Sequence, residues 1–229
     1  MLNKVKILFL LYFIIFSYPA FAHVGHYENL KSIVFSIYWN DNEIGKHTVS
    51  FKKNDNLLTV INNINFEVKT LGIVLYSFES NGTEVFKDGK LIKFNSKTKQ
   101  NKKDKHVNLI FKDGDFIIDG SSFSGRVSSD TFLGTWWNHK ITTAKSQISP
   151  SSGRIIKQKV TFIGKENIKY GEKTYKALHF NFASVENNPD SEKKLNTDVW
   201  YDEESLNWIK ASFKKNGNWE YRLISIEKY

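Results

Sequence analysis

Branched and aromatic apolar residues occupy every second position in the stretch Ile33-Val34-Phe35-Ser36-Ile37-Tyr38-Trp39, which runs into Asn40-Asp41-Asn42. A period of two is typical of a β-strand with one buried face, and Asn and Asp are common turn residues. Beyond the turn, His47, Val49 and Phe51 occupy the equivalent face of a second segment. The stretch therefore predicts a β-hairpin.

Similar alternating segments recur along the chain, and no interval of about ten or more residues has convincing helical periodicity. Ser121–Thr135 is irregular, and Asn138–Ser146 is expected to form one or two helical turns. The expected tight turns are Asn81-Gly82, Asp88-Gly89, Asp113-Gly114 and Asn216-Gly217. Gly164–Gly171 is expected to separate two long strands. This pattern predicts an all-β single domain over residues 23–229, with a curved antiparallel sheet that forms a sandwich or is barrel-like.

Residues 1–22 have the three parts of a secretory signal peptide. Lys4 and Lys6 provide positive charge, Ile7–Phe16 is an apolar run, and Ala20-Phe21-Ala22 matches a cleavage site. The apolar run is about half the length that a membrane-spanning helix needs. We therefore expect cleavage after Ala22, a periplasmic or secreted protein, and no transmembrane segment in the mature chain.

The composition narrows the classes of function. The 229 residues include 33 Lys plus Arg against 24 Asp plus Glu, which gives a net charge of +9, and cysteine is absent. Disulfides, thiolate metal sites and cysteine nucleophiles are thereby excluded. The densest basic run, Lys97–Lys105, contains no aromatic residue and is expected to be a solvated loop. Because no recognition motif accompanies the charge, no nucleic-acid partner is predicted.

Three motifs occur in a characteristic order. They are the opening hairpin Phe35–His47, the central Thr135-Trp136-Trp137-Asn138, and the closing Asp198-Val199-Trp200-Tyr201-Asp202 with its final hairpin. In this order the chain resembles the secreted bacterial proteins grouped as domain-of-unknown-function family 6134. The resemblance implies an exported β-rich domain and implies no activity. By analogy, related secreted domains wrap a curved sheet around an apolar interior, which favours a binding or carrier role.

The candidate ligand-binding residues are aromatic. Trp136 and Trp137 are expected to lie in a strand and to point to opposite faces, with Asn138 and His139 beside them. Trp200 is the third tryptophan of the candidate site. A tryptophan that faces a cavity binds an apolar ligand or stacks on a sugar ring, whereas packing in the core is the commoner role.

Catalytic and metal-binding patterns are missing from the sequence. Asp198 and Asp202 are four residues apart, roughly 13 Å along a strand, which is too far for a catalytic carboxylate pair. The six histidines have no metal-ligand spacing, and no serine elbow or phosphate-binding glycine loop occurs. We therefore predict a non-catalytic module for an apolar or carbohydrate ligand, with no metal and no cofactor. The alternatives are a hydrolase of envelope polymers, with His139 and Asp202 brought together by the fold, and a structural or interaction protein.

Overall fold

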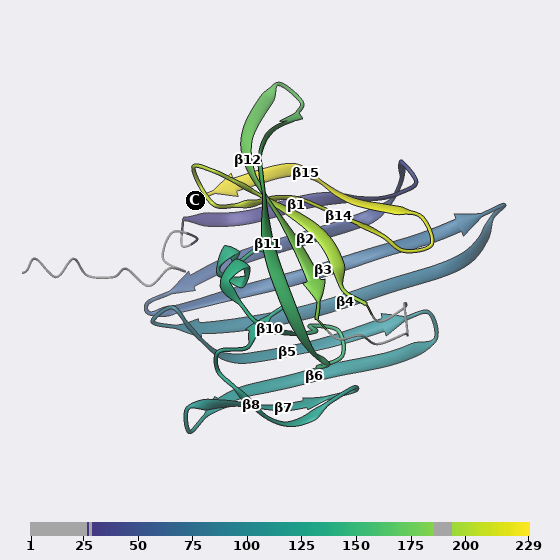
Figure 1. Ribbon diagram of the computed structural model, residues 1–229. Helices are drawn as coiled ribbons and strands as arrows, with labels where there is room; N and C mark the ends of the chain where they lie inside the picture. The colour runs from purple at the N-terminus through teal and green to yellow at the C-terminus, as the bar shows by residue number, and fades with distance from the viewer. Residues whose placement is uncertain (1–26, 28, 186–193) are drawn as a thin grey trace, which may run out of the picture.

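The computed structural model describes Tyr27, residues 29–185 and residues 194–229 (Figure 1). The expected signal peptide, residues 1–22, lies outside the described residues. The strands are β1 (Leu30–Trp39), β2 (Asn42–Asn54), β3 (Leu57–Thr70), β4 (Ile73–Lys87), β5 (Lys90–Gln100), β6 (Lys103–Lys112), β7 (Asp115–Gly120), β8 (Ser124–Ser128), β9 (Phe132–Leu133), β10 (Ser146–Ile148), β11 (Ile155–Tyr170), β12 (Lys173–Ser184), β13 (Asn196–Asp202), β14 (Trp208–Lys214) and β15 (Asn218–Lys228).

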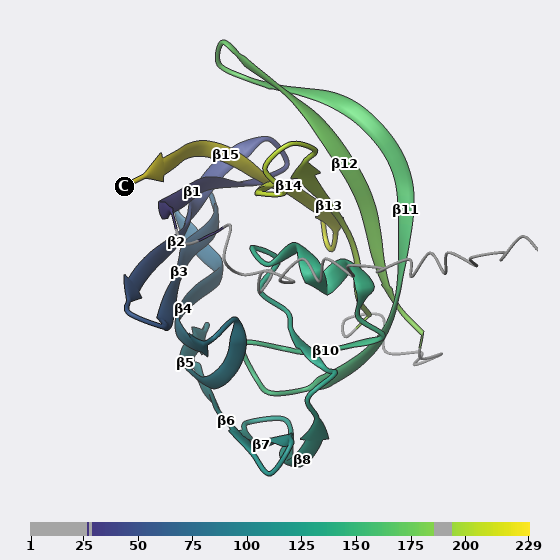
Figure 2. The ribbon, with the colours of Figure 1, turned by 90° about the vertical axis from the view of Figure 1, so that its left-hand side faces the viewer.

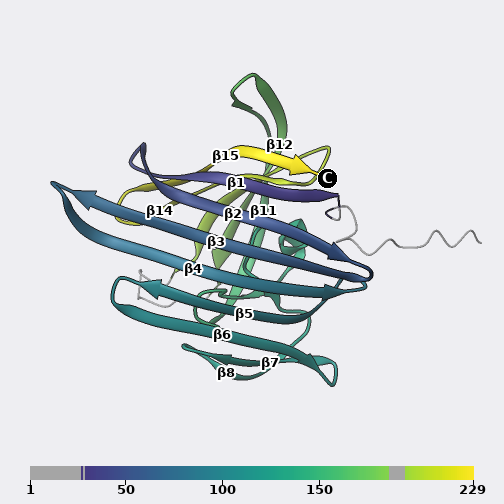
Figure 3. The same ribbon diagram turned by 180° about the vertical axis from the view of Figure 1, so that it is seen from behind.

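All of these strands belong to one sheet. Its order is β8-β7-β6-β5-β4-β3-β2-β1-β15-β14-β13-β12-β11-β10-β9, so two meanders meet where β1 pairs with β15 (Figure 3). Neighbouring strands are antiparallel except for the short β9 and β10, which are parallel. The first meander consists of β1 to β8, and the second runs from β15 back to β10.

The sheet curves around a segment of its own chain (Figure 2). Residues 129–154 cross the interior and carry the 3₁₀ helix η2 (His139–Thr143) and β10. Side chains on both meanders bind this segment: Ser96 Oγ donates to Pro150 O at 2.6 Å, and Gln158 Nε2 donates to Ala144 O at 3.1 Å. The predicted all-β, curved antiparallel fold is confirmed, and its shape is barrel-like.

Most of the predicted turns lie where the sequence places them. Asn40 and Asp41 both have positive φ, 48° and 63°, and join β1 to β2. Asp88-Gly89 and Asp113-Gly114 repeat this geometry, which suits the right-handed twist of the paired strands. The predicted helical turns within Asn138–Ser146 are confirmed as η2.

The turn predicted at Asn81-Gly82 is wrong, because both residues lie in the middle of β4. A β-carbon on Gly82 would lie 3.2 Å from the ring of Phe94, so the glycine leaves room for that ring on the neighbouring strand. The chain turns instead at Leu71-Gly72, where φ is 49° and 78°. The separator predicted at Gly164–Gly171 is also wrong, since β11 continues through it and ends at Tyr170.

The solvated loop predicted at Lys97–Lys105 is wrong as well: these residues form the paired ends of β5 and β6. Their inward-facing residues are polar, so the sequence does not show the alternation of apolar and polar residues that indicates a strand. Ser96 and Thr98 are buried, and Thr98 Oγ1 lies 2.7 Å from Ser80 Oγ on β4. The hydroxyls pair across strands, so the buried polar groups are satisfied.

Two hydrophobic clusters fill the interior. The larger lies between β1–β4 and β12–β15 and includes Trp137 from the inner segment. The smaller packs β5–β7 against Leu133 and Ile148. Phe35 is fully buried with its ring 3.9 Å from that of Trp208, which confirms the predicted inward face of β1.

Candidate functional site in the barrel interior

Trp137 occupies the centre of the larger hydrophobic cluster. Its side chain has no exposed surface and makes edge-to-face contacts with Tyr27, Phe51 and Phe86, with centroid distances of 5.1, 5.4 and 5.5 Å. Trp136 and Trp137 lie in a turn of the inner segment, so the expectation that they belong to a strand is wrong. The turn lets both rings point into the protein from a segment that already lies inside it.

Glu84 is a carboxyl group buried in this apolar surrounding. It lies on β4, is 1% exposed, and accepts hydrogen bonds from Trp137 Nε1 at 2.7 Å and Asn62 Nδ2 at 2.9 Å. Burial raises the pKa of Glu84 to about 7, although these donors oppose the shift. Close to neutral pH, this side chain therefore exists in both the protonated and the charged form.

His47 extends the polar chain on β2. Its Nε2 lies 3.3 Å from Oδ1 of Asn62, and burial lowers the pKa of His47 to about 4, so the imidazole is neutral at pH 7. Because the amide of Asn62 donates to Glu84, its oxygen accepts from Nε2–H of His47. Nδ1 of His47 is then an acceptor, and it has no partner among the described residues.

A cavity of about 240 Å³, called here the His47 cavity, lies beside this chain. Its walls combine apolar side chains such as Ile64 and Phe94 with His47 and Asn62. Trp136 also lines it, and Nε1 of Trp136 is buried without a hydrogen-bond partner in the described part of the chain. The backbone oxygen of Trp136 accepts from Tyr201 Oη at 2.8 Å, which anchors the turn.

A second cavity of about 320 Å³, called here the Glu84 cavity, lies between β4–β7 and the inner segment. Its apolar walls are Phe86, Leu91, Phe111, Phe116, Phe132 and Leu133. The polar residues include Glu84, Asn138, Lys90 and Lys140. Thr135 lines both cavities. The hydrogen-bonded chain Glu84–Asn62–His47 also connects them, because Glu84 lines the Glu84 cavity and both Asn62 and His47 line the His47 cavity.

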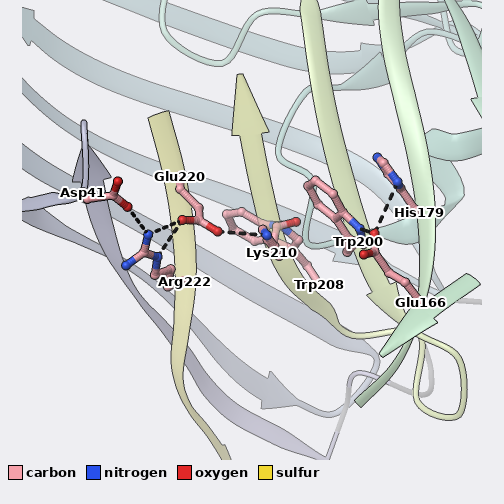
Figure 4. A network of polar contacts seen from close by, with 8 residues as sticks. All are labelled: Asp41, Glu166, His179, Trp200, Trp208, Lys210, Glu220 and Arg222. Carbon is pink, nitrogen blue, oxygen red and sulfur yellow. Dashed lines mark hydrogen bonds and ion pairs between the residues drawn. The ribbon is translucent and has the colours of Figure 1, made fainter. Parts of the chain in front are cut away.

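The predicted site residues do not all lie together. Trp136, Trp137, Asn138 and His139 lie together on the inner segment. Asn138 caps η2 by accepting from Lys140 N at 3.2 Å, and Nδ1 of His139 lies 3.1 Å from Tyr27 Oη. Trp200, in contrast, lies in a polar network with His179, Glu166 and Lys210 (Figure 4), and it lines neither cavity.

The residues of the polar network around Trp200 contact one another. The Trp200 ring stacks on His179 at 4.1 Å, its indole N–H donates to Glu166, and Lys210 lies 4.8 Å above it. Lys210 in turn pairs with Glu220 at 2.9 Å. These contacts cover Trp200, which is 6% exposed, so the ring is packed rather than presented to a ligand.

Sequence reasoning missed Glu84, Asn62 and the role of His47. A signal was present for His47, because a histidine on an apolar strand face needs a buried partner. Asn62 and Glu84 belong to strands that only the register places beside it: His47 pairs with Ile64, and Asn62 with Gly82. For the alternative hydrolase, His139 contacts Tyr27 and Tyr201, whereas Asp202 accepts from Ser205 Oγ at 2.5 Å.

Among Tyr27 and residues 29–185 and 194–229, no cluster of three or more His, Cys, Asp or Glu is placed to hold a metal ion. The described part of the chain also contains no helix that is both long and apolar enough to cross a membrane.

A sheet rolled around an aromatic interior with two cavities defines a barrel-like antiparallel β protein. The chain belongs to the family described as Domain of unknown function (DUF6134), whose model matches residues 35–224. The family resemblance noted in the sequence is thereby confirmed.

The fold is similar to one solved in another family of unknown function. The crystal structure of the beta-barrel-like protein of DUF1849 from Brucella abortus superposes with a TM-score of 0.59 at 9% identity, covering 87% of this chain and 99% of that chain. At this identity the likeness concerns the fold alone. No curated protein matches the chain.

Proposed function

We propose that this protein is exported and acts as a non-catalytic binding or carrier module for an apolar, single-chain amphiphile. The observation that carries the proposal is the Glu84 cavity, whose walls are mainly aromatic and aliphatic. Its volume, about 320 Å³, falls at the lower end of the range of small-molecule sites. The signal-peptide pattern of residues 1–22 supports export.

The polar residues of the cavity favour an acidic head group on the ligand. Lys90 and Lys140 line the cavity, Lys90 exposed and Lys140 half-buried, and each provides an ammonium group for a carboxylate or phosphate. With a pKa of about 7, Glu84 is partly protonated at pH 7, which lessens its repulsion of an acidic ligand. A carbohydrate is less suited, because six apolar side chains leave many of its hydroxyls without partners.

A fluorescence displacement assay tests this proposal. The neutral dye N-phenyl-1-naphthylamine is bound to the purified protein and displaced with dodecanoic acid or with dodecanol. We expect the acid to displace the dye at a lower concentration than the alcohol, and Lys140→Ala to remove most of that difference. The substitution Leu91→Trp fills the cavity and is expected to abolish dye binding.

The matched control is Ile224→Trp, which adds the same ring at a position that is 52% exposed and is not part of the cavity lining. Equal dye binding by wild type and Leu91→Trp would reject the cavity as the site. Native mass spectrometry of protein isolated from the periplasm is expected to show a co-purifying amphiphile and an N-terminus at His23. Protein that keeps residues 1–22 would reject export by cleavage.

A further inference from the structure

The β3–β4 hairpin projects beyond the strands on both sides of it. β3 pairs with β2 only as far as Phe66, and β4 pairs with β5 only from Phe78. Within the sheet, residues 67–77 therefore pair only with each other, and the four residues from Phe66 to Thr70 span roughly 13 Å. Figures 1 and 3 show this hairpin as the longest extension of the first meander.

The tip of this hairpin is apolar and exposed. Leu71 is 97% exposed, Ile73 65% and Leu75 57%, with Val74 between them. Single exposed apolar residues are ordinary, but a contiguous group at the end of a projecting element marks an interaction surface.

Leu71 also occupies an unfavourable backbone position. Its φ is 49°, and the same position of the comparable turns holds Asn40, Asp88 and Asp113. A leucine lacks the short polar side chain that makes the left-handed region acceptable to Asn and Asp. The leucine therefore contributes neither burial nor turn stability to the folded chain.

A basic hairpin flanks the tip at the same end of the sheet. The turn between β5 and β6 is tied to β4, since Ser77 N donates to Asn101 Oδ1 at 2.8 Å and Asn101 N donates to Ser77 O at 2.8 Å. The segment Lys97–Lys105 around this turn contains five lysines and one aspartate. Lys105 has its pKa lowered by burial and by the positive charges of Lys103 and Lys215, which shows that lysines gather here.

We propose that this end of the molecule docks onto an anionic membrane surface, independently of the ligand cavity. Leu71, Ile73 and Leu75 enter the interface between head groups and acyl chains, and the lysines around Asn101 contact the anionic head groups. Amphipathic elements of this kind bury about 5–10 Å into the interface, which is within the reach of the projecting tip. Apolar insertion and lysine attraction act together in such binding.

A single-cysteine label tests the insertion. Because the chain has no cysteine, Leu71→Cys places one nitrobenzoxadiazole dye at the tip, and Ile224→Cys provides the matched control on an exposed apolar position. With vesicles of mixed phosphatidylcholine and phosphatidylglycerol, we expect a blue shift and stronger emission for the tip label alone. Equal responses from both labels, or an equal response to phosphatidylcholine vesicles, would overturn the proposal.

Vesicle co-sedimentation of unlabelled variants separates the two contributions. Leu71→Asn with Ile73→Thr is expected to weaken binding roughly tenfold or more, and Asn suits the left-handed turn, so the fold is retained. Lys102→Glu with Lys103→Glu is expected to weaken vesicle binding at least about fivefold for each lysine replaced. The control, Lys52→Glu with Lys87→Glu at the opposite end of the sheet, is expected to leave vesicle binding unchanged.

Unchanged vesicle binding by the tip variant rejects the docking surface. A change in self-association without a change in vesicle binding rejects it too, in favour of contact between copies of the chain. The cavity variant Leu91→Trp is expected to bind vesicles like wild type, so failure of the carrier proposal and failure of membrane docking are distinguishable.

Discussion

Glu84 and His47 belong to one buried hydrogen-bonded chain, yet their pKa values shift in opposite directions relative to ordinary values. Burial raises the pKa of Glu84 to about 7 and lowers that of His47 to about 4, because each charged form is disfavoured in the apolar interior. Between pH 4 and 7 the two effects on stability oppose each other. Single substitutions are therefore expected to reveal a pH dependence that the wild type hides.

Glu84→Gln is expected to increase relative stability at high pH. The folded-state pKa of Glu84 lies above its unfolded value of 4.5, so its stabilising contribution is present below pH 4.5 and is lost as pH rises through about 7. The unfolding free energy of the variant minus that of wild type should rise by about 3 kcal/mol across this window. Urea unfolding at several pH values measures this difference, with exposed Glu79→Gln as the control. A flat difference would show that Glu84 titrates normally.

His47→Gln is expected to act in the opposite direction. The folded-state pKa of His47 lies below its unfolded value of 6.5, so its contribution is present above pH 6.5 and is lost as pH falls through about 4. The variant keeps a donor for Asn62, and its stability relative to wild type should rise by about 3 kcal/mol on acidification. The same urea titration tests this, and His106→Gln at an exposed histidine is the control. A relative stability that falls with acidification would contradict the buried neutral imidazole.

At the scale of elements, glycines mark the places where strands approach closely. Gly45 lies on β2 opposite the register shift at Ile37/Tyr38, and a β-carbon there would lie 2.1 Å from Asn65 O and 2.4 Å from Phe66 Cβ. The obstruction is backbone and the start of a side chain, so no rotamer change relieves it. β2 and β3 would have to separate.

Gly45→Ala is therefore expected to cost about 3 kcal/mol of unfolding free energy, which is at the upper end for overpacking. Gly72→Ala is the comparison: its surroundings are open and only its φ of 78° opposes the alanine, so about 1 kcal/mol is expected. Denaturant unfolding of both variants measures the contrast. Equal losses of unfolding free energy in the two variants would mean that β2 and β3 separate easily at Gly45.

At the scale of the whole molecule, the pairing of β1 with β15 joins the two meanders in the middle of the sheet. Phe35 pairs with Leu223, and Tyr229 Oη donates to Phe51 O at 2.9 Å. The larger hydrophobic cluster includes residues from both meanders and from the inner segment. Neither meander keeps its buried face without the other.

The two meanders are expected to unfold together in one transition. Circular dichroism, tryptophan fluorescence and a dye on Ser124→Cys in β8 should give the same denaturant midpoint, because two-state unfolding makes all probes coincide. A separate, earlier transition of the β8 dye would show that the first meander opens independently at its edge.

The strand class, most turns and the inward face of β1 could be predicted from the sequence. These features depend on neighbouring residues, because a two-residue period and an Asn or Asp in a turn are local signals. The sequence also identified the family through motifs that the family model confirms. It failed at Lys97–Lys105 and Asn81-Gly82, where inward-facing residues are polar or small and the local pattern no longer marks a buried face.

The contents of the sheet's interior could be learned only from the folded structure. The grouping of His47, Asn62 and Glu84 depends on the register of three strands. Trp200 is separated from Trp136 because Trp200 lies on β13, whereas Trp136 lies in a turn of the inner segment. Because the sheet curves, residues 129–154 lie in its interior, and they line both cavities together with the sheet. A local pattern carries none of this information, because cavities arise between segments that are distant in sequence and meet only when the sheet closes around them.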